Sequence, residues 1–247
     1  MTMHRLTREC RSCSHAVLSV AMALLLLPSV LALGKEGDGK SSREEGRFDI
    51  YVSGERIGRE DFSIERSVDA IRSRSSLNFR DPGRRNQRVR IETDLTMDSE
   101  YTPKAYRLNT DIDGKKVSVA GTFIPGQATF EYEANGISRK RGLLVGDHYI
   151  MLDTNVFHHF AFVAQLFNFD SDKTQSMEVI IPQELANGII KVAGAGVEET
   201  SVGGRRRKLH HLTVDSGALL IDLWVDNQKT LYKIALPAKG IEVIRDR

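Results

Sequence analysis

The chain has 247 residues, with 35 Lys and Arg against 33 Asp and Glu, a formal net charge of +2. Residues 1–34 hold three Arg and one Glu, which leaves 32 of the 35 basic and 32 of the 33 acidic residues in the rest. A balanced charge gives no support for nucleic-acid binding, so no nucleic-acid partner is predicted. Both cysteines, Cys10 and Cys13, lie in this first segment, so we expect a domain without disulfides.

The first 34 residues have the pattern of an export signal. A basic segment, Arg5–Arg11, precedes an apolar run over 16–33, and Ala32-Leu33-Gly34 places small residues where signal peptidase cleaves. The alternative is a retained anchor, since the run is just long enough to cross a bilayer. Cleavage predicts a periplasmic or secreted protein of the cell envelope that is not integral to the membrane. Residues 35–46 are polar and rich in Gly and Ser, which predicts a disordered linker.

Residues 47–247 predict a single antiparallel β domain. Over 88–97, apolar and polar residues alternate strictly, which indicates a long strand with one wet and one buried face. Long one-sided strands favour a large curved sheet, an open half-barrel, over a compact sandwich. Short turns such as Asn135-Gly136 join neighbours that should pair antiparallel. In the first hairpin Ile57 and Phe62 have opposite parity, which predicts a β-bulge near Gly58.

One helix is predicted inside this sheet, at 155–167. No Asp, Glu, Lys or Arg occurs between Asp153 and Asp170, and Asp153 and Thr154 are suitable N-caps. The segment is apolar on nearly all sides, so it must be buried or must face something other than water. Two interpretations follow: the helix is a core plug in the concave side of the sheet, or it lines or gates an apolar ligand cavity.

The candidate ligand-binding residues lie on or just before this helix. Phe160 is predicted to be part of the plug, whereas for Phe167 both interpretations stay open. Adjacent histidines diverge by about 100° on a helix and do not readily share one ion, so buried, hydrogen-bonded histidines are favoured over a metal site completed by His210. The candidates are Asp153, Phe157, His158, His159, Phe160 and Phe167.

The sequence lacks the common catalytic and nucleotide-binding motifs. It contains no Gly-x-Ser-x-Gly elbow, no Walker loop and no His-Glu-x-x-His. We therefore predict no catalytic residue, no metal ligand and no cofactor.

Several segments resemble a known group of proteins. Phe48–Gly58 with Phe62–Ile64 is similar to the opening hairpin of uncharacterised exported bacterial β proteins, catalogued as domains of unknown function. Leu152–His159 with Ile181-Pro-Gln183 resembles their middle, and Trp224–Asp226 with Ile234–Pro237 resembles their end. The implied architecture is similar to the half-barrels of periplasmic lipoprotein carriers, in which helices plug a concave sheet. The resemblance implies a fold and no activity.

Three functional hypotheses remain. The leading one is an exported binding or scaffold protein of the cell envelope that holds an apolar small molecule or lipid, such as an acyl chain. The second is a metal-dependent or other hydrolase of envelope material that uses His158, His159 and Asp153. The third is a structural partner of another envelope protein.

Overall fold

The computed structural model describes residues 41–246. The predicted leader and residues 35–40 of the predicted linker lie outside this range. The first half of the described chain contains β1 (Ser42–Val52), β2 (Glu55–Arg66), β3 (Ile71–Asp81), η1 (Pro82–Arg84), β4 (Gln87–Met97), β5 (Pro103–Ile112), β6 (Lys115–Ile124), β7 (Gln127–Ala134) and β8 (Ile137–Leu144). The second half contains β9 (Ile150–Met151), η2 (Phe157–His159), α1 (Phe160–Leu166), β10 (Gln175–Ile181), η3 (Pro182–Glu184), β11 (Ala186–Val202), β12 (Arg205–Asp215), β13 (Leu220–Val225), β14 (Leu231–Leu236), η4 (Pro237–Lys239) and β15 (Ile241–Arg245).

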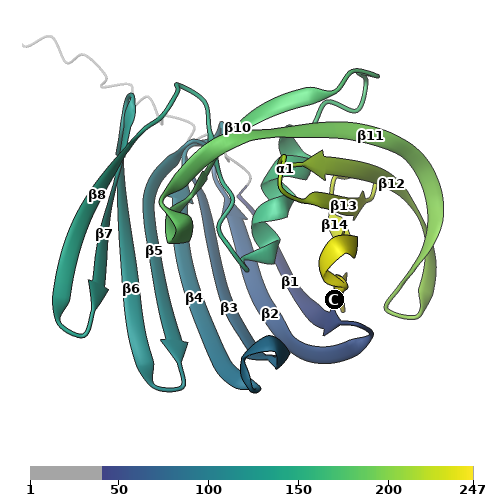
Figure 1. Cartoon of the computed structure of the whole chain (residues 1–247). Helices are drawn as coiled ribbons and strands as arrows, with labels where there is room; N and C mark the ends of the chain where they lie inside the picture. The colour runs from purple at the N-terminus through teal and green to yellow at the C-terminus, as the bar shows by residue number, and fades with distance from the viewer. Residues whose placement is uncertain (1–40, 247) are drawn as a thin grey trace, which may run out of the picture. The chain divides into compact units, whose positions relative to one another are not determined.

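All the strands within residues 41–246 belong to one open 15-stranded sheet. Its order is β8-β7-β6-β5-β4-β3-β2-β1-β15-β14-β13-β12-β11-β10-β9. The first and last strands of the domain therefore pair at the centre, and strands from the middle of the chain form the two edges. The sheet curves around α1, with β1 to β6 on one side and the arch of β10 and β11 over the other (Figure 1). This confirms the predicted mostly-β fold, a large curved sheet around one apolar helix. The single exception to antiparallel pairing among the described strands is β9 with β10, which is parallel.

The predicted alternation over 88–97 and the predicted bulge near Gly58 are also confirmed. Along β4, the buried Val89, Ile91 and Leu95 alternate with more exposed residues, so one face packs and the other is solvated. In the β1–β2 hairpin, Ile50 pairs with Gly58 and the next pair skips one residue, Ile57. This extra residue is the bulge that the opposite parities predicted, and it returns the apolar side chains of β2 to the core face.

The predicted linker is wrong at its C-terminal end. Strand β1 begins at Ser42, which pairs with Arg66 of β2, so residues 42–46 belong to the sheet. Glu44 lies 2.9 Å from Arg245 and 3.4 Å from Arg66. Polar composition predicts disorder there, but ladder hydrogen bonds to β2 and ion pairs to Arg66 of β2 and Arg245 of β15 hold these residues in place.

The predicted helix bounds are also wrong. Regular α-helix covers only Phe160–Leu166, preceded by the 3₁₀ turn η2. Asn155 has φ 62°, in the left-handed region, and cannot belong to a right-handed helix. At the other end Phe167 is extended, with ψ 128°. No helix among residues 41–246 is long and apolar enough to cross a membrane.

The main core fills the concave side of the sheet and includes nearly all of α1. Phe162, Val163 and Ala164 are fully buried within it. A second, small cluster lies on the opposite face of β13, where Trp224 packs with Val202, Leu209 and Ala235. On β13, Ile221, Leu223 and Val225 belong to the main core and Trp224 to the small cluster, whereas Leu220 is exposed.

Candidate functional site

The 3₁₀ turn η2 and the helix α1 form one continuous helical segment, residues 157–166. A carboxylate from β2 accepts hydrogen bonds at the start of this segment. Glu60 is fully buried, and its Oε2 accepts hydrogen bonds from the backbone N–H groups of Phe157 and His158, both at 3.1 Å. The first N–H groups of a helical segment have no partner within it and need acceptors. Glu60 supplies one from 97 residues away in the chain. The predicted N-caps, Asp153 and Thr154, are therefore wrong, since neither η2 nor α1 has a side-chain cap from its own N-cap residue.

His158 joins Glu60 to β3. Its Nδ1 lies 2.6 Å from Glu60 Oε1, and its Nε2 lies 2.7 Å from Ser73 Oγ. In the neutral ring, Nδ1 donates to the carboxylate and Nε2 accepts from the serine hydroxyl. One face of the imidazole stacks on Phe62, with centroids 5.5 Å apart. The backbone and the ring of His158 are thus both held by strands of the first half of the sheet.

The order Ser73–His158–Glu60 is that of a hydrolase triad. All three residues are 0% exposed, and none of them lines either of the two cavities that adjoin the helical segment. A nucleophile has to reach its substrate, and a serine enclosed by the core does not. We therefore assign these residues the role of anchoring the helical segment to β2 and β3.

His159 and Asp153 form the other part of this buried polar cluster. The backbone N–H of Asp153 donates to His159 Nδ1 at 3.2 Å, which places the ring proton on Nε2. Among the described residues, that Nε2 is a buried group without a hydrogen-bond partner. Burial, and then the neighbouring His158, lower the pKa of His159 well below its usual value, so the ring is neutral.

Asp153 ties the loop before η2 to two other elements. Its Oδ2 accepts from the Tyr106 hydroxyl at 2.6 Å, and its Oδ1 accepts from the backbone N–H groups of Thr154 and Gln183. Burial raises the pKa of Asp153, and these hydrogen bonds oppose that shift. Burial also raises the pKa of Tyr106 well above its usual value, with Asp153 as the next cause. Both carboxylate oxygens are satisfied, which favours a structural role over proton transfer.

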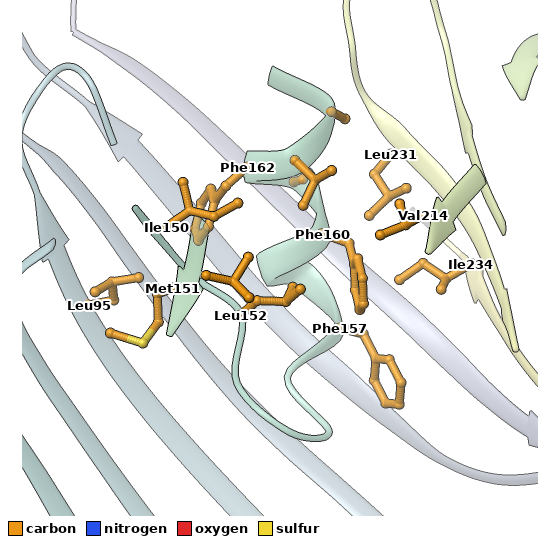
Figure 2. Packing of buried hydrophobic residues seen from close by; sticks show 14 of the residues in the cluster. Leu95, Ile150, Met151, Leu152, Phe157, Phe160, Phe162, Val214, Leu231 and Ile234 are labelled. Atoms are coloured by element: carbon orange, nitrogen blue, oxygen red, sulfur yellow. The ribbon is translucent and has the colours of Figure 1, made fainter. Parts of the chain in front are cut away.

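Two apolar cavities adjoin the other side of the helical segment. Cavity A has a volume of about 510 Å³ and lies between the segment and strands β10, β11 and β13, with Phe160, Val179, Ile190 and Leu219 among its lining residues. Cavity B has a volume of about 570 Å³, and its walls include Ile50, Val52, Ile57 and Phe79. Figure 2 shows Phe157 and Phe160 on the side of the segment that faces Leu231 and Ile234. Both volumes fall in the range of about 300–1,000 Å³ typical of small-molecule sites.

The structure separates the six predicted candidates into three places. Asp153, Phe157 and Phe160 line cavity A, and Phe157 lines cavity B as well. His158 and His159 lie in the polar cluster. Phe167 is buried away from both cavities, with its ring 4.9 Å from that of Phe169.

The sequence analysis missed several residues of the site. Glu60 and Ser73 carried a usable signal: each occupies a core-facing position in an alternating strand, Glu60 in step with Phe62 and Ser73 in step with Ile71. A charged residue in step with core residues predicts a buried partner. The cavity walls on β1, β3 and β11 gave no such signal, because they meet only through the curvature of the sheet.

The side chains proposed as metal ligands do not come together in the described part of the chain. Within residues 41–246, no group of three or more His, Cys, Asp or Glu side chains is arranged to hold a metal ion. His210, its proposed third ligand, instead lies 2.8 Å from Asn227 and packs on Phe169.

Comparisons with known proteins show the fold alone. The chain matches no protein-family profile and no curated protein in sequence. It is similar to the crystal structure of a β-barrel-like protein of domain of unknown function DUF1849 from Brucella abortus, with 10% identity, a TM-score of 0.54, and 82% of this chain and 93% of that chain covered. A DUF1089 family protein from Pseudomonas aeruginosa aligns with 12% identity and a TM-score of 0.45, over 73% of this chain and 90% of that chain. The predicted likeness to uncharacterised bacterial β proteins is confirmed, at the level of the fold.

Proposed function

We propose that this protein binds an apolar ligand of the acyl-chain type in cavities A and B. The observation that supports this most is the pair of adjoining cavities with mainly aliphatic and aromatic walls. Protein interiors are close-packed, and voids much larger than a water molecule are few. An apolar cavity of this size, beside a helix whose residues 160–164 are buried, fits a binding site better than a structural core.

Binding fits the arrangement of polar groups better than hydrolysis does. His158 is sealed in the core with Ser73 and Glu60, and His159 is enclosed beside it. Asp153 reaches cavity A, but its oxygens already accept hydrogen bonds from Tyr106 and two backbone N–H groups. The hydroxyl beside a carboxylate in cavity A is that of Thr154, which donates to Glu184 at 2.7 Å, and no histidine of residues 41–246 lines either cavity to act with them.

Action in the cell envelope is part of this proposal. Its support is the pattern of residues 1–34, with a basic segment, an apolar run and small residues at the cleavage position. In that compartment, membrane lipids and their acyl chains are the abundant apolar molecules. The predicted partner is therefore a lipid or another apolar small molecule.

Native mass spectrometry of protein purified from its own cells tests the proposal. We expect a bound species with the mass of a lipid or fatty acid, which organic extraction removes. Leu219→Trp, which narrows cavity A from the turn between β12 and β13, should lower the occupancy of that cavity. Protein that purifies without any adduct, and that takes up no added fatty acid, would contradict the proposal.

A further inference from the structure

Cavities A and B are two arms separated by one partition. Four residues line both of them: Asn155, Phe157, Lys239 and Ile241. Phe157 and Ile241 are apolar and form the shared wall, whereas Asn155 and Lys239 are the polar members of the shared set. The two volumes, about 510 and 570 Å³, are nearly equal, so neither arm is a minor extension of the other.

The partition is held in place from the polar side. The backbone N–H of Phe157 donates to Glu60 Oε2 at 3.1 Å, and Phe157 itself is only 7% exposed. Glu60 is in turn bonded to His158, which fixes the carboxylate. These bonds fix the backbone of Phe157, from which the ring projects between the two arms.

The cation shared by both arms is Lys239. It is exposed at the end of η4, and the described part of the chain provides its ammonium with no ion-pair partner. The nearby carboxylates are engaged elsewhere: Asp81 faces Arg84 at 3.7 Å, and Glu184 accepts from the Thr154 hydroxyl at 2.7 Å. A free positive charge therefore lies where the two arms share lining residues.

We propose that the ligand is a two-chain amphiphile with an anionic head group, with one acyl chain in each cavity and the head group at Lys239. This inference rests on the proposed function and names its ligand class. A single chain fills one arm and leaves an equal apolar volume empty, whereas two chains joined at one head group match two arms that share a charged rim. Phe157 then selects for two chains, since its ring lies between them.

The test compares two ligands that differ by one chain, dioctanoyl phosphatidylglycerol and monooctanoyl lysophosphatidylglycerol, by calorimetric titration. Each buried methylene contributes about fourfold in affinity, so the wild type should bind the two-chain lipid at least about 100-fold more tightly. Gly188→Trp blocks cavity A, where a Cβ on Gly188 meets nothing within 4 Å, and Val52→Trp blocks cavity B. Either substitution should abolish the advantage of the second chain and leave one-chain binding in the other arm.

Ile124→Trp, on an exposed position of β6, is the matched control and should leave both affinities unchanged. Thermal melting of each variant shows that it is folded. Lys239→Gln should weaken binding of the phosphatidylglycerol about two- to fivefold, as for an exposed ion pair, and leave dioctanoylglycerol unaffected.

Three results would overturn the inference: equal affinities of the wild type for the two lipids, sensitivity to only one of the blocking substitutions, or equal effects of Lys239→Gln on the charged and uncharged lipids. In each of these cases binding persists, so the proposed function stands. Failure of the wild type to bind either lipid or any fatty acid removes the proposed function itself.

Discussion

The two sides of the helical segment, η2 with α1, have opposite chemistry. On one side Glu60, His158 and Ser73 are fully enclosed and bonded to one another. On the other side Phe157 and Phe160 border apolar space. The polar groups hold the segment, and the apolar groups border the cavities that we propose as the ligand site. Phe157 belongs to both sides, since its N–H is anchored by Glu60 and its ring divides the cavities.

The largest loss of stability is expected when the polar side of the helical segment is disrupted. Glu60→Ala removes the acceptor for two backbone N–H groups and for His158, so it should lower the free energy of unfolding by about 3–5 kcal/mol. Urea denaturation measures this. Glu92→Ala is the matched control, because Glu92 is an exposed partner of Arg90, and it should cost less than about 1 kcal/mol. Equal costs for the two variants would refute the anchoring role.

The next prediction compares the phenylalanines at the two ends of α1: Phe160, its first residue, and Phe167, its C-cap. Phe167→Ala should cost about 3–5 kcal/mol, since Phe167 is enclosed by packed side chains. Phe160→Ala should cost clearly less, because Phe160 already borders cavity A, and it should change ligand retention. The sequence predicts that Phe160 is part of the plug and allows both interpretations for Phe167. Melting curves recorded together with fatty-acid binding separate the two, and a larger loss of stability at Phe160 contradicts the assignment.

The smallest expected effect is the contribution of His159 to the pH dependence of the free energy of unfolding. Its folded pKa lies below the usual 6.5, so the unfolded chain binds the proton first and stability falls as pH drops below 6.5. Between pH 7 and pH 5 the wild type should lose about 1–2 kcal/mol more than His159→Asn, whose amide oxygen can replace Nδ1 as an acceptor.

Asp153 acts in the opposite direction, because burial raises its folded pKa above 3.8. Its contribution is present below that value and is lost as pH rises through the folded pKa. The difference between wild type and His159→Asn isolates the histidine from this effect. His148→Asn, at an exposed position, should reproduce the wild-type profile, and parallel profiles for all three proteins would contradict a buried neutral His159.

Features that depend on near neighbours in the chain were predictable. The alternation along β4 and the bulge at Ile57 follow from burial with a period of two residues, and the apolar segment 156–167 had to be enclosed. The helix bounds were not predictable, because Asn155 adopts a left-handed conformation that propensity does not reveal. Strand β1 starts early because its partners are Arg66 and Arg245, far away in sequence.

The candidate site was predictable only in part. Phe157, Phe160 and Asp153 were found because an uncharged apolar segment is conspicuous in a charge-rich chain. Glu60 contacts His158 across 98 residues, and no local pattern predicts which strand faces which helix in a 15-stranded sheet. The cavities depend on the same long-range arrangement of strands. The position of Lys239 at both cavities also depends on it, because η4 carries this residue.

Titration of a fluorescent fatty acid into wild type and Gly188→Trp, with melting of both proteins, tests the central claim most directly. The account predicts saturable binding to the wild type and loss of the portion bound in cavity A in the variant, at an unchanged melting temperature, since the new side chain enters space that is empty. Identical binding curves for the two proteins, or no binding to the wild type, would contradict the claim that these cavities hold the ligand.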